Sequence, residues 1–163
     1  MTKEDFIIRE IQSKDNAQVA KVIRSVLIEL GVPKVGTAYE DKATDEMFEN
    51  FQKITAVYYV LEYQNQIVGG AGVAKLDNFE GNVCELQKMY LAPIARGKGL
   101  GSKLIEKCLE KAKSLNFESC YLETMPYMNA AKELYKKNGF KNLDKPLGNT
   151  GHYSCNVWML KKL

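Results

Sequence analysis

The sequence has few of the residues that build metal sites and disulfide frameworks. It contains one histidine, one tryptophan and four cysteines, and no two cysteines form a Cys-x-x-Cys pair. Because zinc is bound mainly by clustered cysteine and histidine side chains, a metal site is not expected. The cysteines are Cys84, Cys108, Cys120 and Cys155. Their wide spacing favours free thiols that pack as small apolar groups in a protein of a reducing compartment.

Long apolar runs and strong charge of either sign are also missing. No segment approaches the roughly 20 apolar residues that cross a membrane, and the N-terminus lacks the basic and apolar regions of a signal peptide. The net charge is only +3, with lysines in pairs such as Lys136-Lys137 rather than in runs. We therefore expect a cytoplasmic protein without membrane or nucleic-acid partners.

The rest of the composition is typical of a globular domain. The 163 residues are 45% hydrophobic and 26% charged, as in soluble proteins generally. A chain of this length buries roughly two thirds of its unfolded surface, which is enough for a stable core without cross-links. No repeat, linker or low-complexity stretch divides it, so we predict a single domain over residues 1–163.

The order of the predicted elements indicates a mixed α/β fold. Runs of β-branched and aromatic residues predict strands at 6–11, 56–63, 67–76, 83–91, 119–124, 141–143 and 153–160. Apolar residues at helical spacing predict helices at 15–30, 44–53, 99–115 and 130–137, while residues 34–43 have no clear pattern. A hairpin followed by alternating strands and helices predicts one mixed sheet with helices on both faces.

A glycine-rich loop, Arg96-Gly97-Lys98-Gly99-Leu100-Gly101, joins a predicted strand to a predicted helix. The first turn of a helix has unpaired N–H groups and a partial positive charge. Glycines let those groups approach an anion, so the loop predicts a phosphate or pyrophosphate site; the alternative is a merely flexible connection. The spacing matches neither the P-loop nor the dinucleotide fingerprint.

Within this loop, Arg96-x-x-Gly99-x-Gly101 resembles the pyrophosphate signature, Q/R-x-x-G-x-G/A, of the GCN5-related N-acetyltransferase (GNAT) family. Leu86–Pro93 resembles the family's fourth strand, Tyr121-Leu122-Glu123-Thr124 the fifth, and Ala131-x-x-Leu134-Tyr135-x-x-x-Gly139-Phe140 the motif after it. The N-terminal third matches only in its order of elements. The resemblance implies a mostly antiparallel sheet of about seven strands, splayed between the fourth and fifth, with about four helices on both faces.

The resemblance also implies acetyl-coenzyme A as co-substrate, without a metal. Relatives often carry an asparagine where this chain has Met128, so the neighbouring Asn129 either contacts the cofactor or only caps its helix. The cofactor-binding residues implied are Met89, Tyr90, Leu91, Arg96, Gly97, Lys98, Gly99, Leu100, Gly101, Ser102 and Asn129.

Acetyl transfer to an amine needs a base, because an amine with a pKa near 10.4 is protonated at neutral pH. Relatives often place a glutamate at a position like Glu85, which is the candidate base; the alternative is an exposed carboxylate or one paired with Lys88. Strand alternation, unless a bulge intervenes, puts Glu85 on one face with Gln87, Met89 and Leu91, and Leu86, Lys88 and Tyr90 on the other.

Transfer also needs hydrogen-bond donors for the thioester oxygen and an acid for the departing thiolate. Tyr135 is the candidate acid, since the family tyrosine approaches the cofactor sulfur and a phenol stays protonated at neutral pH. The alternative is a core tyrosine on an amphipathic helix. The oxygen is usually met by a backbone N–H of the preceding strand, here near residues 89–91.

The polar and aromatic segment 146–159 is predicted to border the acceptor pocket, as the last loop does in the family. His152 and Tyr153 are its candidate lining residues, and Tyr39 would form the opposite wall. Each has a simpler interpretation as an ordinary surface or packing residue. A nucleophilic pair of His152 and Cys155 is set aside, because residues three apart in a strand point to opposite faces.

These features predict an N-acetyltransferase that moves an acetyl group from acetyl-CoA to a primary amine by direct attack in a ternary complex. The alternatives are a protein N-terminal or lysine acetyltransferase and a non-catalytic acyl-CoA-binding regulatory module. Glu85 and Tyr135 together favour catalysis, and the long polar final loop favours a small-molecule acceptor. Relatives often form dimers, and the open edges of such a sheet would permit a homodimer.

Overall fold

Seven strands form one sheet in the computed structural model, which describes residues 5–163. Residues 1–4, on which the expected lack of a signal peptide partly rests, lie outside the described part. The strand order is β1-β2-β3-β4-β5-β7-β6, and every neighbouring pair is antiparallel except β4–β5. The strands are β1 (Phe6–Glu10), β2 (Ala56–Tyr63), β3 (Gln66–Lys75), β4 (Val83–Leu91), β5 (Ser119–Thr124), β6 (Lys141–Leu143) and β7 (Val157–Lys162).

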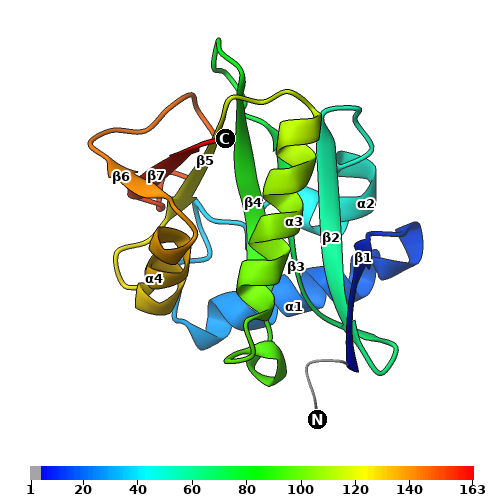
Figure 1. Cartoon of the computed structure of the whole chain (residues 1–163). Helices are drawn as coiled ribbons and strands as arrows, with labels where there is room; N and C mark the ends of the chain where they lie inside the picture. The colour runs from blue at the N-terminus through cyan, green and yellow to red at the C-terminus, as the bar shows by residue number, and fades with distance from the viewer. Residues whose placement is uncertain (1–4) are drawn as a thin grey trace.

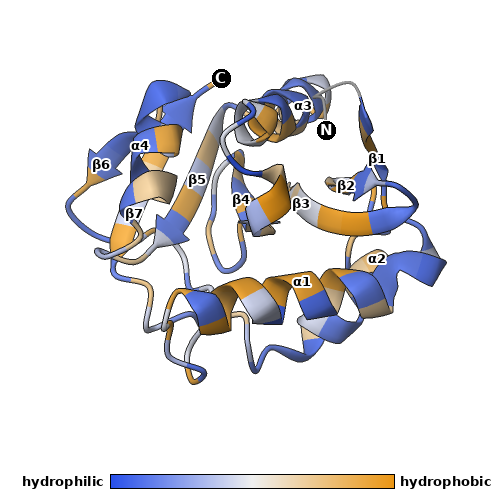
Figure 2. Ribbon diagram, turned by 90° about the horizontal axis from the view of Figure 1, so that it is seen from below, coloured by the Kyte–Doolittle hydropathy of each residue, from blue (hydrophilic) through white to orange (hydrophobic). Residues whose placement is uncertain are grey.

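Helices cover both faces of the sheet, as predicted. Over residues 5–163 they are α1 (Asn16–Glu29), α2 (Met47–Asn50), α3 (Leu100–Ser114) and α4 (Asn129–Lys137). Figure 2 shows α1 and α2 on one side of the sheet, with α3 and α4 on the other. Each side has its own apolar core, one including Leu104 and Cys108 of α3 and the other Ile23 and Leu27 of α1.

The sheet opens between β4 and β5, as the resemblance implied. The two parallel strands pair only at Val83↔Ser119, Cys84↔Cys120 and Glu85↔Tyr121. Beyond Glu85 they separate, and Figure 1 shows them diverging toward the start of α3. This divergence leaves the backbone of the second half of β4 without a partner from β5.

A bulge lies in β4 next to this opening. Tyr90 pairs with Gly70 and Gln87 pairs with Gly72, so two residues of β4 oppose one residue of β3. One of the two, Lys88, has a φ of 47°, and its carbonyl accepts a hydrogen bond of 2.8 Å from the Tyr58 hydroxyl. An extra residue in one strand shifts the alternation of every side chain that follows it.

The bulge changes which residues of β4 share a face. Leu86 packs in the core under α3, and after the bulge Met89 and Leu91 pack against that same core, while Tyr90 faces the α1 side. Simple alternation, which grouped Met89 and Leu91 with Glu85, is therefore wrong. Because of the bulge, the neighbours Gln87 and Lys88 both line the cavity on the α1 side.

Three predicted boundaries were also wrong. The helix expected at 44–53 is a 3-10 turn, Lys42–Asp45, followed by the short α2, because Glu46 leaves the helical conformation with φ −127° and ψ 43°. The strand expected from residue 153 begins at Val157. Asp15 does not cap α1 through its side chain; it forms an ion pair of 2.8 Å with Arg9 instead.

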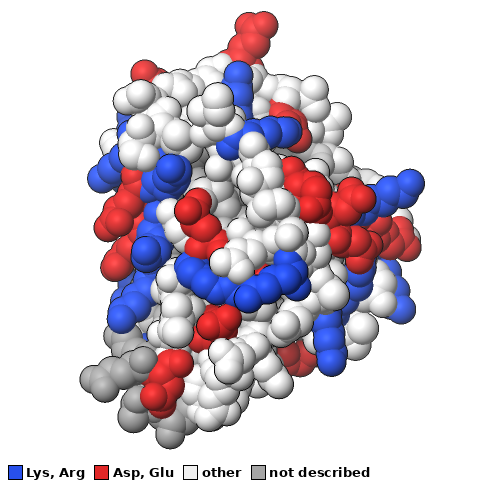
Figure 3. Space-filling view, turned by 90° about the vertical axis from the view of Figure 1, so that its right-hand side faces the viewer, with Lys and Arg blue, Asp and Glu red and all other residues white. Residues whose placement is uncertain are grey.

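Charge is mixed over the surface beside β1 and α2. Figure 3 shows Lys and Arg side chains interspersed with Asp and Glu there, with no large area of one sign. Among the described residues, no helix combines the length and the apolar character needed to span a membrane, and no group of three or more His, Cys, Asp or Glu side chains is placed to hold a metal ion.

Candidate functional site

A groove of about 410 Å³ lies where the end of β4, the glycine-rich loop and α4 meet. Met128, Leu134 and Lys137 contribute to its α4 side, and Val26 and Leu30 of the α1 region close one end. Most of the predicted cofactor residues line it: Met89, Tyr90, Leu91, Arg96, Gly97, Gly99, Leu100, Gly101 and Ser102.

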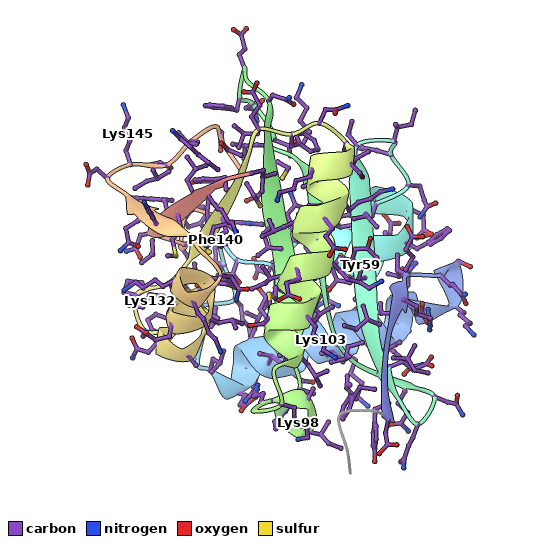
Figure 4. The ribbon with its side chains drawn as sticks, in the orientation of Figure 1. Tyr59, Lys98, Lys103, Lys132, Phe140 and Lys145 are labelled. Atoms are coloured by element: carbon purple, nitrogen blue, oxygen red, sulfur yellow. The ribbon has the colours of Figure 1, made fainter. Side chains whose placement is uncertain are left out.

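Two predicted cofactor residues do not line this groove. The Lys98 ammonium folds back onto its own turn, donating to the carbonyls of Ile94 at 3.0 Å and Arg96 at 3.4 Å; Figure 4 shows Lys98 on the turn before α3. Asn129 is the first residue of α4 and is exposed. It does not act as the N-cap, a position held by Met128.

The glycines of the loop have separate structural roles. Gly97 and Gly99 have φ values of 73° and 75°, and Gly99 is the N-cap of α3. At Gly101 the constraint is steric, because a Cβ there would lie 2.8 Å from Leu134 Cδ2 of α4. The loop therefore brings the unpaired N–H groups of the first turn of α3 to the groove surface, where an anion would be stabilised.

Arg96 ties the loop to two other elements. Its Nε donates to the carbonyl of Leu91 at 3.0 Å, and its two terminal nitrogens reach the Glu29 carboxylate of α1 at 2.7 and 2.8 Å. Hydrogen bonds from the guanidinium lower the pKa of Glu29. The Arg96 side chain thus fixes the loop against β4, and its charge is engaged by Glu29.

Tyr135 lies at the inner end of the groove. Its side chain is buried, and its ring packs edge-on against Phe140 with 6.2 Å between the ring centroids. Burial raises the pKa of the Tyr135 phenol to about 12. A phenol with that pKa stays protonated through the neutral range, so it can donate a proton but cannot act as a base.

A second and more polar cavity, of about 900 Å³, lies on the α1 side of β4. We call it the acceptor-side cleft, and Glu85, Gln87, Lys88, Asp41 and His152 are among its lining residues. They come from three separate parts of the chain. The first half of β4 provides the floor, and the segments around residues 41 and 152 provide the walls.

Glu85 is buried in the floor of this cleft, with 5% of its surface exposed. Gln87 Nε2 donates to its carboxylate at 2.7 Å. Burial raises the pKa of Glu85 to about 7; Gln87 opposes this shift, and the nearby Glu123 adds to it. The alternatives of an exposed carboxylate or one paired with Lys88 are both wrong.

Lys88 pairs instead with Asp41. Its Nζ lies 3.1 Å from Asp41 Oδ2, and His152 Nε2 lies 3.4 Å from the same oxygen. Asp41 Oδ1 also accepts the backbone N–H of Ala43 at 3.0 Å. The hydrogen bond from His152 and the charge of Lys88 hold the pKa of Asp41 well below its usual range. Asp41 therefore stays ionised and fixes two cleft side chains.

The other predicted wall residues lie outside the cleft. The Tyr39 ring lies near Arg24 and Lys34, at 5.8 and 5.0 Å from its centroid, and is not part of the lining. Tyr153 is 73% exposed and borders a smaller hollow with Trp158. Of the three candidate residues, only His152 lines the acceptor-side cleft.

Residues 151–156 form turns rather than a strand, so the premise for excluding a His152–Cys155 pair was wrong. The Cys155 N–H donates to the His152 carbonyl at 3.0 Å. The exclusion of a nucleophilic pair still holds on other grounds. Burial raises the pKa of the Cys155 thiol to about 12, and the His152 ring lies toward Asp41.

Cys155 lies near residues of both cavities. Its thiol lies close enough to Glu85 and Glu123 for their charges to raise its pKa. On the other side it interacts electrostatically with Tyr90 and Tyr135. A molecule reaching through the opening between β4 and β5 would pass from the Tyr135 end of the groove to Glu85.

Sequence reasoning did not identify Asp41 or Lys88 as site residues. Asp41 lies in the segment without periodicity, and the one signal it gives is that of an N-cap residue preceding a helical turn. The sequence suggested Lys88 only as an ion-pair partner of Glu85. No sequence signal marks the bulge that directs the Lys88 side chain into the cleft. Both depend on long-range contacts.

Comparison with known proteins gives a consistent answer. A profile of the Acetyltransferase (GNAT) family matches residues 26–140. The chain is 40% identical over 158 residues to an uncharacterised N-acetyltransferase, YjgM, of Escherichia coli strain K12, covering 96% of this chain and 95% of that protein. It is 29% identical over 107 residues to an IAA acetyltransferase of Azospirillum brasilense, covering 66% and 69% of the two chains.

Solved structures share the fold. A GNAT-family acetyltransferase of Staphylococcus aureus Mu50 superposes with a TM-score of 0.85 at 23% identity, over 97% of this chain and 99% of that one. The PaiA N-acetyltransferase of Thermoplasma acidophilum, solved in complex with coenzyme A, superposes with a TM-score of 0.77 at 19% identity, over 97% and 99%.

Proposed function

The chain belongs to the GNAT family of acetyltransferases, and on that basis we propose that it transfers the acetyl group of acetyl-CoA to the primary amine of a small molecule. It is an N-acetyltransferase that depends on acetyl-CoA. The observation that carries the finer proposal is the pairing of two cavities across the opening of the sheet. One ends at Tyr135 and the other at the buried Glu85.

Acetyl-CoA would occupy the groove. The glycine-rich loop and the first turn of α3 offer backbone N–H groups to its pyrophosphate, and the apolar side chains of Met89, Leu91 and Leu134 would contact the pantetheine arm. The PaiA protein, which has the same fold, was solved with coenzyme A, which supports coenzyme A as the kind of ligand. No metal takes part in the proposed reaction.

Glu85 would act as the base. Its carboxylate accepts a proton from the bound ammonium, directly or through one water molecule, and this frees the nitrogen lone pair. The amine then attacks the thioester carbonyl in a ternary complex, and the new C–N bond forms as the carbonyl becomes tetrahedral. A pKa of about 7 places Glu85 near the working pH, where a general base is most effective.

The oxygen and sulfur of the thioester need separate partners. Backbone N–H groups of β4 near Met89–Leu91, beyond the point where pairing with β5 ends, would donate to the carbonyl oxygen. When the tetrahedral intermediate collapses, the C–S bond breaks and the thiolate leaves. Tyr135 would donate its phenolic proton to that thiolate, giving free coenzyme A. The nitrogen of the new amide would lose its extra proton, and the Tyr135 phenolate would regain one, which leaves the neutral amide and the phenol.

The shape of the cleft favours a small acceptor over a protein. The segment around residue 152 is tied across it by the contact between His152 and Asp41 and by hydrogen bonds from Ser154 to the carbonyls of Val35 and Gly36. A protein chain would require an open groove over Glu85. The whole chain, residues 1–163, would act as one acetyltransferase domain, alone or as a homodimer.

The test combines binding and turnover. Acetyl-CoA should stabilise the protein in a thermal melt, and release of free thiol should then be followed over small primary amines, amino acids, peptides and lysine-rich proteins. Turnover with small amines but not with proteins is expected. Binding without turnover on any amine would instead favour a non-catalytic acyl-CoA module, and turnover confined to proteins would move the acceptor to a polypeptide.

A further inference from the structure

Lys88 has an unusual conformation for its place in the fold. Over residues 5–163, the non-glycine residues with positive φ are Gln64, Asn65, Asn78, Lys88 and Asn116. The other four lie in turns, whereas Lys88 lies inside a strand. Left-handed backbone is unfavourable for a residue with a Cβ, and such strain is typical of functional positions. A lysine at this position is therefore expected to have a role for its side chain.

The side chain lines the acceptor-side cleft. It is 7% exposed, and Asp41 holds its Nζ at 3.1 Å. An ammonium has three N–H donors, and in the described structure Asp41 is its one hydrogen-bond acceptor. Buried charged donors are stabilised only when they are paired. Two donors are therefore left without an acceptor among the described residues, in a cleft that Glu85 also lines.

We propose that the acceptor of this enzyme carries a carboxylate close to its primary amine, as an amino acid does, and that Lys88 binds this carboxylate. The inference rests on the proposed function and names its substrate class. The acceptor's ammonium lies at Glu85 and its carboxylate at Lys88, three residues along β4. Asp41 is a positioning residue that holds the lysine in place.

The charges in the cleft fit such a molecule. Its deep part has the carboxylates of Glu85 and Asp41 beside the ammonium of Lys88, and its outer part has Lys53 and Lys75 with Asp77 and Glu80. The two positive and two negative outer side chains balance one another. Selection between charged and uncharged acceptors would therefore come from Glu85, Asp41 and Lys88. An amine with an adjacent carboxylate brings a positive charge for Glu85 and an acceptor for the N–H donors of Lys88 that Asp41 does not use.

The experiment compares matched pairs of acceptors, each an amino acid and the amine left by its decarboxylation. Thiol release gives kcat/KM for both members at about pH 8.5, where Glu85 is ionised. The wild-type enzyme should prefer the amino acid by about 10- to 100-fold, the usual effect of one charged hydrogen bond. Lys88→Met should reduce this ratio to near one, and Lys88→Arg should restore part of it.

Lys107→Met is the matched control. Lys107 is on the α3 side of the sheet, with its Nζ 5.5 Å from the centre of the Tyr59 ring; Tyr59 is labelled beside α3 in Figure 4. This variant removes the same charge far from the cleft, so the ratio should stay at the wild-type value. Acetyl-CoA binding by each variant, measured by calorimetry, checks that the fold is intact.

The outcomes separate this inference from the function on which it rests. Equal use of amino acids and their decarboxylated amines by the wild-type enzyme would overturn the carboxylate proposal and leave N-acetylation of small amines standing. Equal losses on both members of a pair in Lys88→Met would overturn the role of Lys88. Absence of thiol release with every small amine would defeat the proposed function itself, and this inference with it.

Discussion

The groove lies at the end of β4 and the acceptor-side cleft lies along its middle, and the two are built differently. The groove is formed by backbone N–H groups, glycines and apolar side chains, and most of its surface comes from one continuous stretch of chain, residues 89–102. The cleft is lined by ionisable side chains from several distant segments, and Asp41 holds Lys88 and His152 of two of them in ion pairs. One region recognises shape and phosphate, and the other controls protons and charge.

This difference determines what each region contributes to catalysis. Substitutions in the groove should alter affinity for acetyl-CoA and leave the pH dependence alone, because no group there titrates near neutrality. Substitutions in the cleft should alter rate and pH dependence and leave acetyl-CoA affinity alone. Tyr135 is the expected exception, since it lines the groove but would act on the leaving thiolate.

The largest effect is expected from Glu85→Gln. Loss of a general base lowers kcat/KM for the amine by about 100- to 1000-fold. In the wild-type enzyme kcat/KM should rise with pH through about 7, as Glu85 loses its proton, and the variant should lack this inflection. The measurement is a pH–rate profile with the amine below saturation, together with acetyl-CoA binding.

The variant should bind acetyl-CoA as the wild-type enzyme does. An inflection near pH 7 that persists in Glu85→Gln would assign the titration to another group and remove Glu85 from the base role. A large loss of acetyl-CoA affinity would show that the two regions are not functionally separate.

The same difference explains what could be predicted from sequence. The groove residues form a local motif whose glycine spacing has a physical purpose, so Gly97, Gly99 and Gly101 could be assigned before their φ values and contacts were known. The sheet of about seven strands and its opening between the fourth and fifth strands followed from the family resemblance. Patterns of this kind involve residues that are neighbours in the chain, so they can be recognised in the sequence.

The cleft could be predicted only in part because its geometry depends on tertiary contacts. The face on which Lys88 lies is set by a bulge against Gly70 and Gly72, and strand alternation alone gives the wrong grouping. Asp41 reaches the cleft because a turn replaces the expected helix after it. Tyr39 and Tyr153 were chosen because the family resemblance puts their segments beside the acceptor pocket. In the structure Tyr39 lies against Arg24 and Lys34, and Tyr153 is exposed.

Tyr135→Phe should give the next largest effect. Without the phenolic proton the thiolate leaves unassisted, and kcat should fall by about 10- to 100-fold. The ring still packs against Phe140 and still lines the groove, so acetyl-CoA affinity should change by less than about twofold. Steady-state kinetics and calorimetry separate the two quantities. Weaker binding with unchanged kcat would make Tyr135 a structural residue.

A smaller effect, on affinity alone, is expected from enlarging Gly101. A valine would place methyl groups against Leu134 and into the groove, because even a Cβ at that position stands 2.8 Å from Leu134 Cδ2. Overpacking of this kind should weaken acetyl-CoA binding by about 10- to 30-fold. Gly101→Ala is the graded control and should show a smaller loss. A changed pH profile in either variant would contradict the separation of the two regions.

The smallest effect concerns stability and again distinguishes the cleft from the groove. The pKa of Glu85 is raised from 4.5 to about 7 in the folded chain, so between these values the native state keeps a proton that the unfolded chain releases. Stability must then fall as pH rises through this window. Glu85→Gln removes this penalty and should stabilise the protein by about 1–2 kcal/mol above pH 7, with little gain near pH 5.

Urea unfolding of both proteins at the two pH values measures the difference, and Tyr135→Phe is the control from the groove. The pKa of Tyr135, about 12, lies outside the window, so its substitution should shift stability equally at both pH values. A gain in Glu85→Gln that is the same at pH 5 and pH 8 would mean that the buried carboxylate is not strained by its charge. If the gain appears only at the higher pH, the residue that makes the cleft reactive is also one that destabilises the fold, because a base buried enough to have a pKa near 7 is unfavourable to ionise.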